Sequence, residues 1–295
     1  AEALGFDEFW VIEDCFFTAA VSLAAAALTA TERLHVGIGI VPAVARNPAV
    51  TAMEFATLAG LAPGRFHGGV GHGVQEWMAQ MGERRDSPLT MLDETLAAVR
   101  ALLAGDRLSV EGRYVTLDGV ALELPPAEPP LVSAGVRGPK SLAVAGREAD
   151  GVILAEHCSP DYLRWARQQV SDAAPGDRHH RFTVFAMAAV SDDGDDARRA
   201  LAGPFAQIAA ATPDWLQHLS FFEELSERAA AAGWLAAVEA MPTAGWSDIA
   251  AVGTPAEARA DLEKMADAGA EAIALFPNPA DPLADTRDLA ASLLR

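Results

Sequence analysis

The stretch Leu34–Gly73, LHVGIGIVPAVARNPAVTAMEFATLAGLAPGRFHGGVGHG, decides the fold of this chain. Two glycine-bearing apolar runs, His35–Val41 and Phe66–Gly73, flank one amphipathic segment, Pro48–Leu61. An apolar β-branched run, a helix period and a second apolar run predict a strand–helix–strand unit. Both runs are apolar at successive residues, which is typical of strands in a parallel sheet that is covered on both faces.

Glycines are unusually frequent in these two strands, although glycine weakens a strand. They are Gly37, Gly39, Gly69, Gly71 and Gly73. A strand keeps such residues where its backbone bends or where a ligand approaches closely. In parallel α/β folds ligands bind at the carboxyl ends of the strands, so we expect a ligand to approach there. Tight packing of a helix on the sheet is the alternative explanation.

The alternation of strand and helix continues along the chain. Strands are predicted at Trp10–Asp14, His35–Val41, Phe66–Gly73, Leu131–Val136, Gly151–Glu156, Phe182–Val190 and Glu271–Pro277. Seven strands joined by helices favour an α/β fold of the (β/α)8 TIM-barrel type, as a single domain over residues 1–295. The first residues look like the end of a helix closed by Gly5, so we expect the first barrel strand to be missing from this sequence.

Two segments depart from this alternation. Residues 105–130 alternate in polarity and contain Glu111-Gly112 and Asp118-Gly119, which predicts a hairpin outside the barrel. Residues 192–251 are mostly helical in pattern and predict a helical insertion. A doubly wound open sheet is the alternative fold, but the glycines around His72 lack the spacing of a dinucleotide-binding fingerprint.

Composition narrows the class of protein. The chain has 295 residues, 51% of them hydrophobic, and a formal net charge of −19. Such acidity argues against nucleic-acid binding, which needs clustered Lys and Arg. Two cysteines give neither a disulfide framework nor a zinc spacing, so no metal site is predicted. No membrane span or secretory signal stands out, and we expect a cytoplasmic protein.

An anion site is predicted where one strand turns into a helix, at Ser133–Lys140. Gly135, Val136, Arg137 and Gly138 allow the backbone to curl so that free N–H groups point out of the helix start. Arg137 and the following lysine add positive charge. An ordinary strand–helix turn is the alternative.

Three polar side chains close two other strands. Glu13 and Asp14 end the first strand and are suited to acid–base work or to hydrogen-bonding a cofactor, or are solvated carboxylates at a strand end. His72 lies between glycines at the end of a later strand, where an imidazole can relay protons or serve as a packing residue. His157 and Cys158 follow another strand in the same way. Elbow, metalloprotease and Walker motifs are absent.

Four segments carry a broader resemblance: LGFDEFWVIEDCF, TERLHVGIGIVP, ARNPAVTAMEFATLAGLAPGRFHGGVGHG and GPKSLAVAGREADGVILA. They resemble the bacterial luciferase-like monooxygenase superfamily. Within it they most resemble the methylene-tetrahydromethanopterin reductase-like branch, which uses the deazaflavin coenzyme F420. The similarity runs from Leu4 to Pro277, and residues 47–73 are its most specific part.

The resemblance implies a barrel that holds the coenzyme ring at its carboxyl mouth, and a homodimer. It implies a non-proline cis peptide at Gly39–Ile40, forming a bulge against the ring, and a phosphate contact at the turn 135–138. It places Glu13 and Asp14 near the ring. The cofactor-binding residues it implies are Gly39, Ile40, Gly71, Gly73, Gly135, Val136, Arg137 and Gly138.

One departure from the family concerns the general acid. Several reductases of this type carry a glutamate where this chain has Val74, so His72 is the substitute candidate, beside Glu13 and Asp14. We therefore expect an F420-dependent oxidoreductase that transfers a hydride to or from a small organic substrate. The alternatives are an FMN-dependent monooxygenase that uses reduced flavin and O2, and a protein that binds the cofactor without catalysis.

Overall fold

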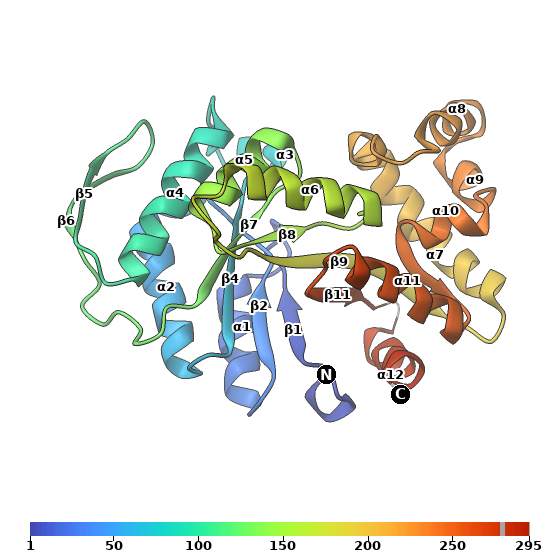
Figure 1. Cartoon of the computed structure of the whole chain (residues 1–295), viewed down its shortest axis with the longest axis horizontal. Coiled ribbons are helices and arrows are strands. Elements are labelled where there is room, and N and C mark those ends of the chain that lie inside the picture. The colour runs from blue at the N-terminus through green and yellow to red at the C-terminus, as the bar shows by residue number, and fades with distance from the viewer. Residues whose placement is uncertain (278–280, 295) are drawn as a thin grey trace. The chain divides into compact units, whose positions relative to one another are not determined.

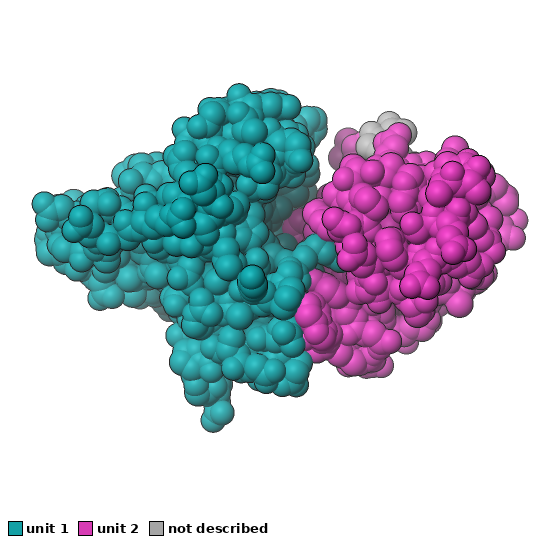
Figure 2. Space-filling view, turned by 90° about the horizontal axis from the view of Figure 1, so that it is seen from above, with its two compact units in different colours: residues 1–154, 166–182 teal, residues 155–165, 183–295 magenta. Residues whose placement is uncertain are grey.

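The structure is a computed structural model that describes residues 1–277 and 281–294 (Figure 1). The chain divides into two compact units (Figure 2). Unit 1 comprises Ala1–Leu154 and Ala166–Phe182, and unit 2 comprises Ala155–Trp165 and Thr183–Arg295. The single domain expected over residues 1–295 stays a prediction.

Unit 1 is built on a parallel sheet with the strand order β1-β2-β4-β7-β8. Its strands are β1 (Glu8–Val11), β2 (His35–Ile38), β4 (Phe66–Gly71), β7 (Leu131–Gly135) and β8 (Gly151–Leu154), with the short β3 (Val41–Pro42) also parallel to β4. All six residues of β4 are buried, as the continuous apolar pattern predicted. β1 begins two residues earlier than predicted and ends before Glu13.

The helices of unit 1 form a row along the sheet, in which each contacts the next: α1, α2, α4 and α5 (Figure 1). The helical elements are η1 (Glu2–Leu4), α1 (Ala20–Ala30), α2 (Pro48–Leu61), α3 (Gln75–Gln80), α4 (Pro88–Leu103) and α5 (Pro139–Glu148). Asn47 and Ser87 cap α2 and α4 with their side chains, and a proline follows each cap. α6 (Pro160–Ala173) is shared by the two units.

The predicted hairpin is present as a separate antiparallel pair, β5 (Leu108–Glu111) and β6 (Thr116–Val120). Its turn is held by Glu94 of α4, which accepts the backbone N–H groups of residues 113, 114 and 115 at 2.7, 2.9 and 2.9 Å. Asp118-Gly119 was expected to be a turn but lies within β6, where Gly119 has a φ of 63°. The Asp-Gly pair therefore marks a shift in the register of β6 against Leu108–Val110 of β5 and not a turn.

Unit 2 contains most of β9 (Arg181–Val190), which pairs in parallel with both β10 (Ala250–Gly253) and β11 (Ala272–Phe276). Its helical elements are α7 (Gly194–Ala211), η2 (Pro213–Leu216), α8 (Phe222–Ala232), α9 (Trp234–Glu239), α10 (Thr243–Ser247), α11 (Pro255–Asp267) and α12 (Pro282–Leu293). The helical insertion is confirmed, but its last residues form β10, which a short alanine-rich run did not reveal. A core around Phe205 and Trp246 joins the helical elements from α7 to α10, and a second cluster joins Ala258 of α11 to Leu289 of α12.

None of the helices formed by the described residues combines the length and the apolar character needed to cross a bilayer.

Two glycines of the sheet are explained by large aromatic neighbours. A Cβ on Gly37 would collide with the indole of Trp10, and one on Gly68 would collide with the ring of Phe55. Phe55 is fully buried. Gly68 thus fits the tight helix-on-sheet packing considered from the sequence, because Phe55 lies in α2. At Gly37 the indole belongs to the neighbouring strand β1, and packing between strands accounts for the glycine without a ligand.

The side chain of Ile40 explains two further glycines. A Cβ on Gly135 would lie 2.5 Å from Ile40 Cγ2, and one on Gly71 would lie 2.9 Å from Ile40 Cγ1. Gly71 and Gly135 are register partners in the β4–β7 pair. Ile40 therefore occupies the volume that side chains on these two strands would otherwise fill.

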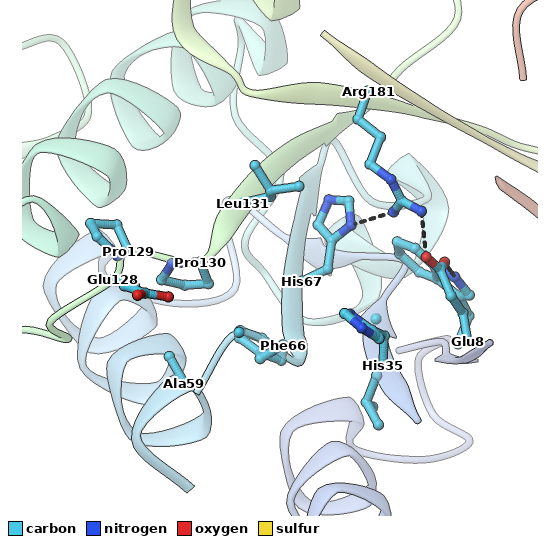
Figure 3. A pocket seen from close by; sticks show the side chains of 14 residues that line it. Glu8, His35, Ala59, Phe66, His67, Glu128, Pro129, Pro130, Leu131 and Arg181 are labelled. Atoms are coloured by element: carbon cyan, nitrogen blue, oxygen red, sulfur yellow. Dashed lines mark hydrogen bonds and ion pairs between the residues drawn. The ribbon is translucent and has the colours of Figure 1, made fainter. Parts of the chain in front are cut away.

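A chain of hydrogen bonds joins four strands at the amino end of the sheet, and Figure 3 shows the part of it that runs from Glu8 through Arg181 to His67. The Trp10 indole N–H donates to Glu8 at 2.8 Å, and Glu8 pairs with Arg181. Arg181 donates to His67 Nδ1 at 3.0 Å, and His67 Nε2 lies 2.7 Å from the Ser133 hydroxyl oxygen. Arg181 can only donate, so the proton of the neutral imidazole is on Nε2, which donates to Ser133. Burial, and then the charge of Arg181, lower the pKa of His67 to about 3.

His67 makes acid stability testable. The unfolded histidine binds a proton below its usual pKa of 6.5, whereas the folded one resists protonation down to about pH 3. The unfolded state therefore gains protons first as pH falls, and His67 lowers the free energy of unfolding by about 1.4 kcal/mol per pH unit in this window. We expect urea titrations to show this slope in the difference between wild type and His67→Gln.

His35→Gln is the matched control, since it changes an exposed histidine that lines the same cavity. It should keep the wild-type slope. Parallel stability–pH curves for wild type and His67→Gln would contradict the prediction.

The packing of Ile40 against Gly135 gives a second prediction. Gly135→Ala should lower the free energy of unfolding by about 1–3 kcal/mol, because the new methyl group overlaps Ile40 Cγ2. Gly138→Ala is the control in the same turn, since Gly138 has a φ of −73° and open space at its Cβ position. In the double variant Ile40→Ala/Gly135→Ala the loss should be smaller than the sum of the single losses. Additive losses in denaturant titrations would refute the contact.

Candidate functional site

The parallel sheet of unit 1 brings the predicted site residues to one edge. Glu13 follows β1, Ile40 follows β2, His72 follows β4 and the turn 135–138 follows β7. Because all these pairings are parallel, the four carboxyl ends face the same side of the sheet. Their gathering at one edge was expected from the sequence, whereas the roles assigned to them stay predictions.

The bulge predicted after β2 is present. The Gly39–Ile40 peptide is cis, as expected, and the Gly39 N–H donates to the Val11 carbonyl at 2.8 Å. The Ile40 side chain turns toward Gly71 and Gly135 rather than away from the sheet. Cys15–Phe16, in the loop after β1, is a second non-proline cis bond that nothing in the sequence indicated.

Glu13 is held in an ion pair that sequence reasoning missed. Its carboxylate accepts two bonds from the Arg46 guanidinium, one of them at 2.8 Å, and accepts the Ala20 N–H at the start of α1 at 3.1 Å. Arg46 also lies 3.2 Å from Glu54 of α2. The Glu13 side chain is only 10% exposed. This geometry makes Glu13 a clamp on the β1–α1 loop.

Asp14 differs from its neighbour. It is solvent-exposed, yet the surrounding protein removes enough water from its carboxyl group to raise its pKa. A raised pKa keeps the carboxyl group protonated at a higher pH than an ordinary aspartate. Of the two adjacent carboxylates, Asp14 is thus the exposed one with a raised pKa, whereas Glu13 is held in an ion pair.

His72 makes two hydrogen bonds within the protein. Its Nδ1 lies 3.2 Å from the Pro88 carbonyl oxygen, and its Nε2 lies 2.9 Å from the Ser141 hydroxyl oxygen. Burial lowers the pKa of His72, opposed by the bond to the Pro88 carbonyl. The imidazole is therefore neutral near pH 7, and both ring nitrogens are engaged.

The turn after β7 leads directly into α5. Gly138 is the N-cap of α5 and provides no side-chain cap, and Pro139 occupies the first helical position. The Val136 N–H donates to the Ile153 carbonyl at 3.3 Å, so this predicted anion donor is already used within the sheet. The donors available at the helix start are therefore shifted toward Lys140 and Ser141.

The loop after β4 carries no acid. Gly73 has a φ of 68°, which favours glycine, and Val74 is exposed. Met78 of α3 is fully buried beneath Gly73, so it belongs to the core. Neither side chain can donate a proton, so the general acid expected near this position is not supplied by Val74 or Met78.

His157 and Cys158 belong to unit 2 and are both buried. His157 has a φ of 65°, and its ring meets the edge of Phe205 at a centroid distance of 4.3 Å. Both residues are parts of the packing of unit 2.

A cavity of about 300 Å³ opens at the amino end of the unit 1 strands (Figure 3). Its wall includes His67, Glu8 and Arg181, which hydrogen-bond one another, and Glu128 lies across an apolar floor. No predicted site residue lines it. His67 was not singled out from the sequence, because its partners lie 66 and 114 residues away.

A model of the luciferase-like monooxygenase family matches residues 1–272. The chain is 30% identical over 217 residues to 5,10-methylenetetrahydromethanopterin reductase of Methanolobus tindarius, covering 72% of this chain and 66% of that protein. It is 35% identical over 147 residues to a phthiodiolone/phenolphthiodiolone dimycocerosates ketoreductase of Mycobacterium kansasii, covering 48% and 40%. The match thus spans two thirds or less of these relatives' own length.

Solved structures resemble the chain over nearly its whole length. F420-dependent tetrahydromethanopterin reductase from Methanopyrus kandleri has a TM-score of 0.79 at 19% identity, covering 99% of this chain and 92% of that one. An F420-dependent secondary alcohol dehydrogenase in complex with an F420–acetone adduct has a TM-score of 0.78 at 20% identity, covering 99% and 91%. The oxygenating constituent of 3,6-diketocamphane monooxygenase from Pseudomonas putida, in complex with FMN, has a TM-score of 0.73 at 16% identity, covering 99% and 88%.

Because their sequence identities to this chain are low, these solved structures are evidence for the fold alone. They confirm the predicted α/β TIM-barrel fold class. The family model covers more than nine tenths of the chain, and the resemblance seen in the sequence is confirmed with it. The chain belongs to the luciferase-like monooxygenase family.

Proposed function

We propose that this protein is an oxidoreductase that binds coenzyme F420 and transfers a hydride between C5 of the deazaflavin ring and a small organic substrate. One observation carries the proposal. Ile40, in the bulge after β2, packs on Gly135, the residue that opens the turn into α5. A ligand with a planar ring and a phosphate ester would therefore find a support for each on adjacent parts of one sheet edge.

The start of α5 has the donors that a phosphate needs. Gly138 provides no side-chain cap, and the proline that follows it has no N–H. The first backbone N–H groups of the helix are therefore those of Lys140 and Ser141, and no capping side chain accepts from them. Arg137 and Lys140 add positive charge in a chain whose net charge is −19. A phosphate ester is the group that such a helix start stabilises.

The coenzyme, when bound, supplies the hydride chemistry, and the protein supplies position and a proton. Ile40 and Gly39 shape the surface for the ring. Glu13, held by Arg46, fixes the loop that carries Asp14. Asp14, with its raised pKa, is the group we assign to hold or release a proton beside the substrate.

Two other functions are alternatives that the experiment described below can support. An FMN-dependent monooxygenase that uses reduced flavin and O2 has support from the fold, since an FMN-bound monooxygenase shares it. Cofactor binding without catalysis has support from Val74, which leaves the loop after β4 without a carboxylate.

Titration of the purified protein with F420 and with FMN, followed by absorbance and fluorescence, tests the proposal. We expect tighter binding of F420, and reduction of the bound coenzyme by a panel of small alcohols or its reoxidation by small carbonyl or unsaturated compounds. Tighter FMN binding with substrate-dependent O2 uptake would replace the proposal with the monooxygenase. Tight binding without turnover on either panel would favour the binding protein.

Charge reversal at the turn gives a further prediction. Arg137→Glu should weaken binding of the phosphate-bearing cofactor about tenfold at low ionic strength, a loss of about 1.4 kcal/mol. The loss should shrink as salt screens the charge. Arg33→Glu makes the same charge change at an exposed position before β2, at the opposite edge of the sheet, and should leave affinity unchanged. Equal affinities of wild type and Arg137→Glu at low salt would remove Arg137 from the site.

A further inference from the structure

His72 joins three elements through one ring. It follows β4, its Nδ1 faces the carbonyl of Pro88, the first residue of α4, and its Nε2 faces the hydroxyl of Ser141 in the first turn of α5. A carbonyl oxygen only accepts, so the ring proton is on Nδ1. Nε2 therefore accepts from the Ser141 hydroxyl at 2.9 Å. The direction of both bonds follows from the chemistry of the partners.

This arrangement is unsuited to a general acid. The nitrogen that carries the proton already donates to Pro88, and the other nitrogen already accepts from Ser141. Burial lowers the pKa of His72, so the doubly protonated ring is scarce at neutral pH. The chemistry that the sequence suggested for His72 therefore finds no proton to give.

Ser141 is the residue through which His72 can act. Ser141 is the third residue of α5, in a first turn that has no side-chain cap. Its backbone N–H is one of the two donors left at the helix start, and its hydroxyl is turned to His72. On the other side of the imidazole, Nδ1 faces the carbonyl of Pro88 at the N-terminus of α4, which Ser87 caps.

We propose that His72 is a positioning residue for the cofactor phosphate, which it serves by holding Ser141 and with it the first turn of α5. The proposal rests on the proposed function, because it assumes that a phosphate binds at this turn. It replaces the catalytic role expected for His72 with a structural link between β4 and the phosphate site. It assigns Ser141, which no sequence pattern singled out, to the same site.

Affinities for cofactor pairs that differ in the phosphate test the proposal. FMN and riboflavin share a ring and a ribityl chain and differ only in the phosphate. F420 and its deazariboflavin core form a second pair, whose members differ in the phosphate together with the lactyl and glutamyl groups that it carries. Ser141→Ala should weaken the phosphate-bearing member about three- to tenfold and leave the phosphate-free member within about twofold. Ser141→Thr, which keeps the hydroxyl, should restore the wild-type difference between the two members.

The histidine is tested in the same cycle. His72→Leu should produce the same selective loss, and the double variant His72→Leu/Ser141→Ala should lose no more than either single variant, because both remove one link. His72→Gln keeps an acceptor and should lose less. If a variant lost the same affinity for both members of a pair, His72 and Ser141 would have a merely structural role. If neither single variant lost affinity, the link between them would not serve the phosphate. Each result overturns the proposal.

Two readouts separate this proposal from the function on which it rests. Wild type that binds neither member of either pair would overturn both. Wild type that prefers the phosphate-bearing member, with variants that keep this preference, would overturn the proposal alone. In the protein without cofactor, the nitrogen chemical shifts of His72 should report a neutral ring with the hydrogen on Nδ1, and Ser141→Ala should change these shifts. A ring with the hydrogen on Nε2 would also overturn the proposal about His72.

Discussion

The contact on which the carboxyl edge of unit 1 depends is the seating of Ile40 between two strands that lack side chains there. Gly71 and Gly135 are register partners, and the methyl groups of Ile40 occupy the space above both. The end of β2 is thereby fixed to β4 and β7, whereas β2 itself pairs with β1 and β4. The backbone at Gly39 gains a further tie to β1 through Val11. The three loops that we propose to meet a ligand thus start from strand ends that are joined through Ile40.

Most of the fold could be predicted from sequence because its signals are local. Continuous apolar runs, proline after a capping serine or threonine, and a helix period all act within about fifteen residues. The amphipathic segment Pro48–Leu61 forms α2 with the bounds that its pattern predicted. β10 was missed because a run as short as Ala250–Gly253 has no periodicity of its own, and becomes a strand only through β9. The glycines lie in or just after strands, as predicted. The side chains that leave no room for a Cβ at these positions come from other elements of the fold and could not be inferred locally.

The candidate site was predictable as a set of positions but not as a set of contacts. Each residue at the end of a strand could be placed at one edge, because parallel strands align their ends. The pairing of Glu13 with Arg46 spans 33 residues, and that of His72 with Ser141 spans 69. No spacing rule reaches that far. These partners hold Glu13 in an ion pair and engage both ring nitrogens of His72, and the catalytic roles assigned to the two residues stay predictions.

The network from Trp10 to Ser133 has a consequence for how this scaffold can be altered. It joins β1, β4, β7 and the first residue of β9 at the amino end, using groups that are satisfied by one another. The loops proposed to meet cofactor and substrate all leave from the opposite end. Substrate range is then open to directed evolution by exchange or randomisation of the carboxyl loops, with the amino-end residues kept constant as the fixed half of any library.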